Sequence, residues 1–180
     1  MSLLESTMVA LGGPCPDFAL PGVDGKVWHR DDFHAPVLLV AVMCNHCPYV
    51  QAVDGRLNAL AKAFTGRCDV VGINANDAEA YPEDGFDAMR SRARALGFVF
   101  PYLHDETQAF AKALGAVCTP EFFVYDVDRK LRYRGRLDDN WQDARRVTRQ
   151  ELRMAIDALL SGQPVPEPQR PSMGCSIKWK

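Results

Sequence analysis

Two cysteines separated by two residues, Cys44 and Cys47, lie between an apolar run and a stretch with helical periodicity. The run before them, residues 36–43, is rich in β-branched side chains and predicts a buried strand. After them, apolar residues recur at the spacing of one helix face: Val50, Val53, Leu57, Leu60, Ala61 and Phe64. The motif therefore predicts an α/β fold with two thiols at a strand-to-helix junction.

This junction gives the thiols a reactive setting. We expect Cys44 to lie at the helix N-terminus, where free N–H groups and the helix dipole favour an anion. A thiol in that place loses its proton more easily, and the thiolate is the nucleophile. Cys47 follows one turn later, close enough to form a disulfide with Cys44. The motif thus predicts thiol–disulfide exchange.

Composition excludes several other classes. The chain has 180 residues, 47% apolar and 24% charged, with a net charge of −2, so neither nucleic acid nor a membrane surface is expected as a partner. The first 13 residues carry no signal-peptide pattern, and no apolar run reaches the roughly 20 residues of a membrane span. We expect a cytoplasmic protein, in which six cysteines do not form a secreted-type disulfide scaffold.

Turn signals and periodicity predict the remaining elements in order. These are a hairpin (17–20 with 26–28), a strand (68–74) parallel to the first, helices at about 82–96 and 106–114 around a short apolar segment (98–103), a hairpin (122–125 with 131–134) and a helix at about 148–160. The order predicts a mixed central sheet flanked by helices, with an N-terminal β-hairpin and an inserted helix. We expect one domain over residues 1–162 and a Pro-rich C-terminal tail, 163–180, that packs on it.

A second motif, Cys118-Thr119-Pro120, precedes the strand that starts near Phe122. A proline at a strand entrance, after a threonine, is a typical place for a cis peptide bond. With this loop, the chain resembles the thioredoxin fold, and its opening hairpin resembles the AhpC/TSA branch of the redoxins. The segments 43–50, 100–103, 118–123 and 174–180 also resemble a bacterial subfamily of thioredoxin-like redoxins that carries Cys-Asn-His-Cys.

The resemblance implies roles for individual residues. Cys44 corresponds to the attacking cysteine, Cys47 to the resolving cysteine, and Pro120, preceded by Thr119, to the cis-proline that presents backbone to a substrate chain. The resemblance implies little about the substrate; from the two thiols we predict a thiol–disulfide oxidoreductase without a cofactor, acting on protein or small-molecule disulfides. His46 beside the motif is expected to stabilise the thiolate and make the couple more oxidising; the alternative is a half-exposed helix residue.

Two other functions remain open. The redoxin branch includes peroxiredoxins, which implies antioxidant activity on peroxides. Their pattern places a threonine three residues before the reactive cysteine, where this chain has Ala41, and an arginine nearby, for which Arg134 and Arg136 are candidates. The second alternative is a non-catalytic binding or copper-chaperone module. No second cysteine pair with zinc spacing exists, so we expect no metal site.

Further cysteines and a missing acid complete the predictions. The apolar strand before the motif lacks the buried acid that thioredoxins keep there, so the proton for Cys47 must come from water or from Glu121 beside the proline.

Cys118 lies two residues before Pro120, and Cys175 lies in a tail that also contains Trp179. We hypothesise that the tail folds back and that Cys118 and Cys175 form a second redox pair or a relay with Cys44 and Cys47. The alternative is that both are small buried hydrophobes.

Overall fold

The computed structural model describes residues 3–180. A central sheet of five strands has the order β6-β5-β4-β8-β9. Its strands are β4 (Val37–Val42), β5 (Cys68–Asn74), β6 (Tyr102–His104), β8 (Glu121–Tyr125) and β9 (Leu131–Gly135). Strands β4, β5 and β6 are parallel, whereas β8 runs antiparallel to both β4 and β9. The predicted mixed sheet and its parallel pair at residues 37–42 and 68–73 are confirmed.

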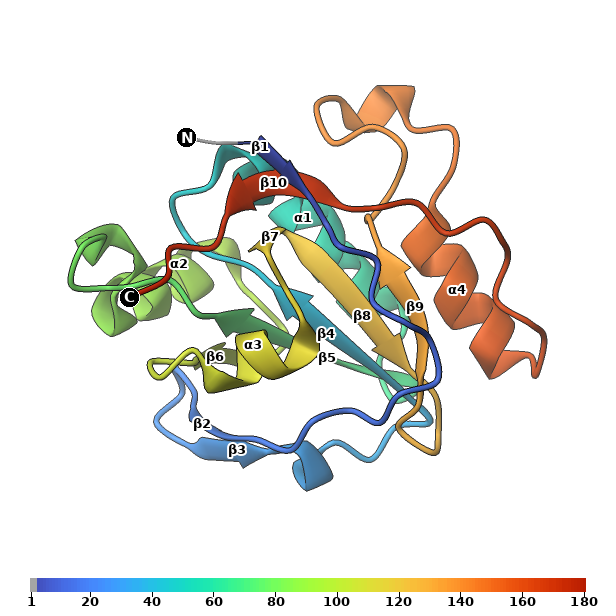
Figure 1. The fold of residues 1–180 in the computed structure, drawn as a ribbon, viewed down its shortest axis with the longest axis horizontal. Coiled ribbons are helices and arrows are strands. Elements are labelled where there is room, and N and C mark those ends of the chain that lie inside the picture. Colours follow the sequence, from blue (N-terminus) through green and yellow to red (C-terminus); the bar gives the residue numbers. More distant parts are fainter. Residues whose placement is uncertain (1–2) are drawn as a thin grey trace.

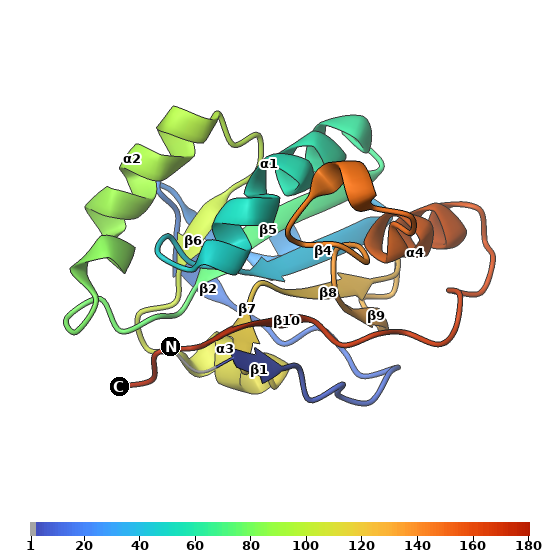
Figure 2. The ribbon, with the colours of Figure 1, turned by 90° about the horizontal axis from the view of Figure 1, so that it is seen from above.

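Helices and loops cover both faces of this sheet (Figures 1 and 2). One face carries α1 (Pro48–Ala63), α2 (Phe86–Leu96) and α4 (Glu151–Leu160); the other carries α3 (Ala109–Leu114) and the hairpin of β2 (Ala19–Pro21) and β3 (Val27–His29). Every residue of β4 is buried, and alternate side chains enter different cores. This double burial is why the strand reads as a continuous apolar run in the sequence.

Several predicted helices are shorter than expected. The segment 82–96 is divided at Gly85, which has extended backbone, into a 3-10 turn, η2 (Pro82–Asp84), and α2. The predicted helix at 106–114 begins only at Ala109, since Gln108 has a φ of +64°, and the one at 148–160 begins at Glu151. Two further 3-10 turns lie at Arg30–Asp32 and Ala144–Arg146. The break at Gly85 matters because η2 places Asp84 beside the thiols.

A second sheet joins the two ends of the described chain. Its order is β1-β10-β7, all antiparallel, with β1 (Leu3–Glu5), β10 (Met173–Ser176) and β7 (Cys118–Thr119). In Figure 1 the red β10 lies between the dark blue β1 and the short β7. The sequence did not predict these strands, because two to four residues are too few to show a period. Among residues 3–180, no helix is both long and apolar enough to cross a membrane.

Candidate active site

The two thiols of the Cys-x-x-Cys motif lie at the carboxyl end of β4, and both cysteines are fully buried. Helix α1 begins at Pro48, a residue suited to the first helical position because its missing N–H is not needed there. Cys47 is therefore the N-cap residue, and Cys44 lies three residues earlier in non-helical chain. The expectation that Cys44 occupies the helix N-terminus is wrong: that place belongs to Cys47.

This placement separates the acidities of the two thiols. The pKa of Cys47 is lowered from 9.0 to about 5, chiefly by its hydrogen bond with the Cys44 thiol and further by those with the Cys175 thiol and the backbone N–H of Val50 in the first turn of α1. The same hydrogen bond to Cys47, together with burial and the nearby Asp84 carboxylate, raises the pKa of Cys44. The shared hydrogen bond thus lowers the pKa of Cys47 and raises that of Cys44.

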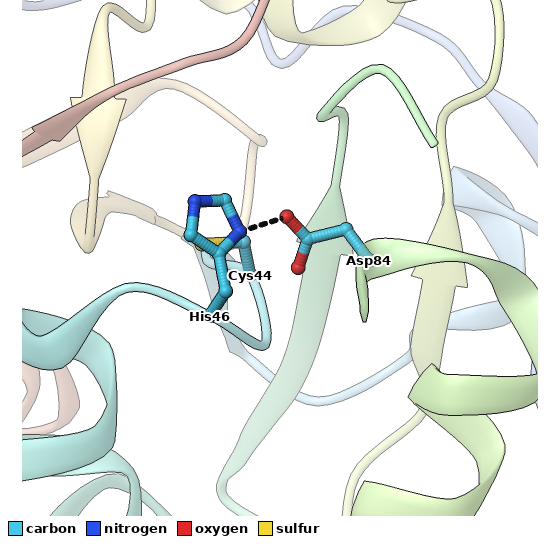
Figure 3. Close-up of side chains that lie close together, drawn as sticks. All are labelled: Cys44, His46 and Asp84. Atoms are coloured by element: carbon cyan, nitrogen blue, oxygen red, sulfur yellow. Dashed lines mark hydrogen bonds and ion pairs between the residues drawn. The ribbon is translucent and has the colours of Figure 1, made fainter. Parts of the chain in front are cut away.

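Cys44 lies against polar groups that come from distant parts of the chain. Its sulfur is 3.4 Å from the hydroxyl of Thr119. The imidazole of His46 and the carboxylate of Asp84 are on another side of it, and Figure 3 shows the three side chains together. His46 Nδ1 and Asp84 Oδ2 share a short hydrogen bond. Cys44 is thus surrounded by groups that can hold or exchange a proton.

Asp84 is the residue that sequence reasoning missed. It is completely buried, yet three groups hydrogen-bond to its carboxylate: the backbone N–H of Asn45 at 2.6 Å, the amide of Asn76 at 2.8 Å, and His46. The predicted absence of a buried acid on β4 is true of that strand. However, η2 supplies an acid from the loop after β5, whose carboxyl end adjoins that of β4. That adjacency of parallel strands is the signal that could have found it.

His46 lies beside Cys44 but outside the helix, and its expected effect on the thiolate stays a prediction. It lies two residues before α1, so the interpretation as a half-exposed helix residue is wrong. Its ring stacks on Tyr81, with centroids 5.4 Å apart and an interplanar angle of 5°. Its hydrogen-bond partner is Asp84, and its side chain is only 12% exposed. The imidazole is therefore held firmly between Tyr81 and the buried acid beside Cys44.

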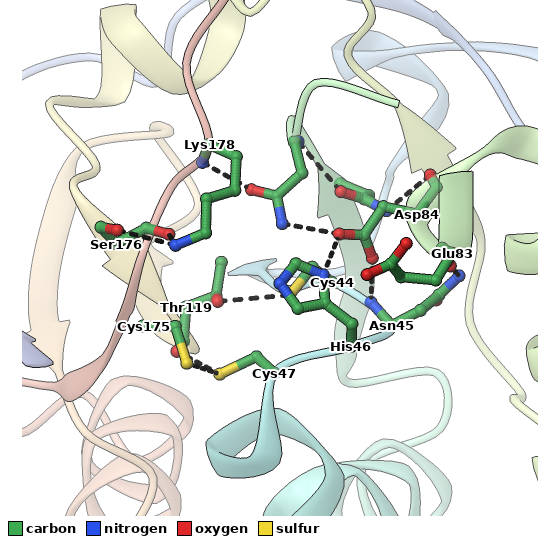
Figure 4. Close-up of polar contacts among 12 residues, drawn as sticks. Cys44, Asn45, His46, Cys47, Glu83, Asp84, Thr119, Cys175, Ser176 and Lys178 are labelled. Atoms are coloured by element: carbon green, nitrogen blue, oxygen red, sulfur yellow. Dashed lines mark hydrogen bonds and ion pairs between the residues drawn. The ribbon is translucent and has the colours of Figure 1, made fainter. Parts of the chain in front are cut away.

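The C-terminal strand packs against the Cys118-Thr119-Pro120 loop. The Thr119–Pro120 peptide bond is cis, as predicted. Cys175 pairs with Thr119, and Ser172 Oγ donates a 2.6 Å hydrogen bond to the Pro120 carbonyl. Figure 4 shows the result: the sulfur of Cys175 faces that of Cys47, at 2.8 Å. The tail thus covers the thiol pair and adds a third sulfur.

Cys118 does not take part in this sulfur cluster. It pairs with Ser176, one position along from Thr119 and Cys175, so its side chain points to the opposite face of the strand pair. Its thiol lies 3.8 Å from the Glu121 carboxylate, and burial raises its pKa. The predicted pair of Cys118 with Cys175 is therefore wrong, because a step of one residue along a strand reverses the side-chain direction.

Glu121 also differs from its suggested role. Its carboxylate accepts hydrogen bonds from the backbone N–H groups of Val117, at 3.0 Å, and Cys118, at 3.4 Å. Burial raises its pKa from 4.5 to about 7. It holds the backbone of the loop before Pro120, and the acid beside the thiol pair is Asp84 instead.

Cys44, His46 and Asp84 also offer one sulfur, one nitrogen and one oxygen ligand atom within 4.8 Å of one another. This mixed set differs from the thiolate and thioether ligands that copper(I) prefers. Both oxygens of Asp84 already accept hydrogen bonds within the protein. The expectation that the chain holds no metal stays a prediction.

Comparisons with known proteins agree with this architecture. A family model described as the AhpC/TSA family matches residues 11–134. A solved structure of an uncharacterised conserved protein from Geobacillus kaustophilus is 48% identical and has a TM-score of 0.96; the match covers 100% of this chain and 97% of that one. A comparison with curated proteins finds no match. The resemblance to a Cys-Asn-His-Cys subfamily stays a prediction.

More distant solved structures share the fold. A thiol:disulfide interchange protein of the thioredoxin family from Chlorobium tepidum is 19% identical, with a TM-score of 0.59 over 70% of this chain and 86% of that one. A peroxidoxin from Mycobacterium tuberculosis is 20% identical, with a TM-score of 0.60 over 73% and 88%. The fold is therefore thioredoxin-like, as predicted.

Proposed function

The chain belongs to the AhpC/TSA family, and from this membership and the thiol geometry we propose that it is a thiol–disulfide oxidoreductase. In this proposal, Cys44 and Cys47 cycle between dithiol and disulfide. The substrates are disulfides of proteins or small molecules in the cytoplasm. Family membership supports redox chemistry in general, whereas the choice of a disulfide substrate rests on the site itself.

One observation carries the proposal: two buried thiols are hydrogen-bonded to each other at the end of β4, and Cys47 is the N-cap residue of α1. At neutral pH, a pKa of about 5 keeps Cys47 ionised, and the thiolate is the reactive form of a thiol. A second thiol in contact with it can then form or break a disulfide without a large movement. These are the requirements of two-step thiol–disulfide exchange.

We assign the first attack to Cys44, after its proton has passed to Cys47. The Cys47 sulfur is enclosed by the Cys175 sulfur and by the Thr119 carbonyl, at 3.2 Å. Cys44 instead lies beside His46, whose side chain reaches the surface. The Cys44 thiolate attacks one sulfur of the substrate, a mixed disulfide forms, and the other sulfur leaves as a thiolate, which takes the proton from Cys47.

Resolution follows from the acidity of Cys47. Its thiolate attacks the Cys44 sulfur, the bond from Cys44 to the substrate breaks, and the second substrate thiolate leaves and takes a proton from water. The substrate disulfide is reduced by two electrons and the protein dithiol is oxidised by two. Because neither cysteine is exposed, a disulfide must enter past the segments that cover them. This burial favours small or extended substrates over bulky ones.

The test uses the reduced protein and bis(2-hydroxyethyl) disulfide. Cys47→Ser should slowly accumulate a mixed disulfide on Cys44, because water must then take the Cys44 proton and the resolving thiol is missing, whereas Cys44→Ser should not. Mass spectrometry of the acid-quenched protein detects the adduct. Trapping on Cys47 in the Cys44→Ser variant would reverse the two roles, and the absence of any adduct in both variants would contradict the oxidoreductase proposal.

The same protein tested with hydrogen peroxide examines the alternative. Thr119, rather than a residue at position 41, supplies a hydroxyl near Cys44. Both predicted arginines have other partners: Arg134 binds Gln169 and Arg136 binds Glu151. We therefore expect stopped-flow oxidation by the disulfide to outpace oxidation by peroxide. A faster peroxide reaction with a sulfenic acid on Cys44 would favour a peroxidase.

A further inference from the structure

Cys175 is held in place by a continuous series of contacts. Its strand β10 pairs with β7, and on either side Ser172 Oγ binds the Pro120 carbonyl at 2.6 Å and the Ile177 N–H binds the Val117 carbonyl at 3.0 Å. Gly174 makes this close approach possible, because a Cβ at that position would lie 1.9 Å from the Thr119 carbonyl oxygen. The tail therefore lies on the loop in a single register.

This register determines where the sulfur points. Residues directly opposite each other in an antiparallel pair project to the same face. Cys175 is opposite Thr119, whose side chain contacts Cys44, so the Cys175 side chain projects toward the thiol pair. The distance from its sulfur to that of Cys47 is 2.8 Å, across 128 residues of sequence. Cys47 thus has a thiol partner on each side, Cys44 and Cys175.

The end of the tail is also tied to the acid beside Cys44. Asn76 donates its amide to Asp84 at 2.8 Å and accepts the backbone N–H of Lys178 at 2.9 Å. The Lys178 carbonyl in turn accepts the backbone N–H of Asp77 at 2.8 Å. In Figure 4, Lys178 and Asp84, the two ends of the connection through Asn76, lie above the contact of Cys47 with Cys175. Cys175 therefore lies within the network of the site itself.

We propose that Cys175 is a third redox cysteine, which takes over the disulfide from the Cys44–Cys47 pair. This proposal rests on the proposed function, since it needs Cys44 and Cys47 to be oxidised first by a substrate disulfide. The Cys175 sulfur attacks the Cys47 sulfur, the Cys44–Cys47 bond breaks, and a Cys47–Cys175 bond forms. The proton of the Cys175 thiol passes to the Cys44 thiolate that leaves. No further oxidant is consumed, because the exchange moves one disulfide within the protein.

In this proposal the three thiols have different roles. Cys44 returns to its reduced form while the two oxidising equivalents are stored between Cys47 and the tail. The stored disulfide links residues 128 positions apart, so it restricts the unfolded chain and stabilises the folded one. It also fixes β10 covalently to the start of α1. Reduction of this bond by a second thiol partner would complete the cycle.

Peptide mapping tests this directly in the full-length protein. Trypsin places Cys44 and Cys47 on one peptide, residues 31–56, and Cys175 on another, residues 154–178. Protein oxidised with one equivalent of bis(2-hydroxyethyl) disulfide is quenched in acid, alkylated and digested without reductant. We expect the two peptides to be linked in the wild type and in Cys44→Ser, once the latter is oxidised with diamide. We expect no link in Cys47→Ser or Cys175→Ser.

Cys118→Ser is the matched control, because Cys118 is equally buried on the neighbouring strand but faces away from the sulfur cluster. It should keep the cross-link. The wild type and Cys118→Ser should also melt at a higher temperature when oxidised than when reduced, and Cys175→Ser and Cys175→Ala should lose this difference. A disulfide found only within peptide 31–56, with Cys175 fully alkylated, would overturn the proposal while leaving the proposed function intact. Failure of the proposed function would instead leave Cys44 and Cys47 unoxidised by the disulfide in every variant.

Discussion

Replacing Gly174 by alanine tests whether the close approach of the tail controls the thiols. A Cβ there would lie 1.9 Å from the Thr119 carbonyl oxygen and 2.7 Å from its carbon, whereas ordinary contact begins at 3.4 Å. The difference between 3.4 Å and 1.9 Å means that β10 must move by about 1.5 Å. Because the obstacle is backbone on a loop held by Glu121, it cannot rotate aside. Overpacking of this kind costs about 1–3 kcal/mol.

The same movement should change the chemistry of Cys47. A displacement of about 1.5 Å lengthens the 2.8 Å sulfur contact with Cys175 to about 4 Å, so Cys47 loses one of the hydrogen bonds that favour its thiolate. We expect the pKa of Cys47 to rise above about 5. The melting temperature should fall by roughly 2–4 °C for each kcal/mol lost. The measurements are thermal unfolding and the pH dependence of iodoacetamide labelling, quantified separately for each cysteine.

Gly55→Ala provides the control. Gly55 lies within α1, and a Cβ there would meet no atom within 4 Å. It should gain up to about 1 kcal/mol from helix propensity and leave the labelling profile of Cys47 unchanged. If Gly174→Ala melts like the wild type and its Cys47 labels like that of the wild type, then β10 is not held in contact with the thiols.

Three further predictions concern ionisable groups in and beside the site. The raised pKa of Glu121, about 7 against 4.5, gives a stabilising contribution that is complete below pH 4.5 and lost as the pH rises through 7. As the pH rises from 4.5 to 7, the free energy of unfolding measured in urea should therefore fall less for Glu121→Gln than for the wild type, by up to about 3 kcal/mol. Parallel curves of unfolding free energy against pH for the two proteins would contradict this. The lowered pKa of Cys47 acts in the opposite sense, since its contribution is complete above pH 9.0 and lost as the pH falls through about 5. The stability difference between the reduced wild type and Cys47→Ser should accordingly grow from pH 5 to pH 9, and a constant difference would argue against an ionised Cys47. Asp84→Asn should destabilise the protein by about 1–3 kcal/mol, because the N–H groups of Asn45 and Asn76 donate to the two carboxylate oxygens, one of which an amide replaces with NH2. The same variant should lower the pKa of Cys44, seen as a shift of its alkylation profile to lower pH.

Much of the fold could be predicted because its signals are local. Strand β4 and helix α1 follow from an apolar run and a helical period, and the positions of β5, β8 and β9 follow from similar runs. The exact start of α1 is harder to predict, because the capping of the first turn decides it. A shift of a few residues moved the helix N-terminus from Cys44 to Cys47, and this reversed the expected acidities of the thiols.

The residues of the site fall into two groups, those close together in the sequence and those brought together only by folding. The sequence by itself determined that Cys44 and Cys47 lie together at a strand-to-helix junction, because residues close in the chain are necessarily close in space. Only the tertiary structure decided their other neighbours. Asp84 reaches Cys44 through the adjacency of parallel strands, and Cys175 reaches Cys47 through the pairing of two short strands with a fixed register. Such pairings depend on the packing of the whole chain, and no local pattern of apolar residues predicts them.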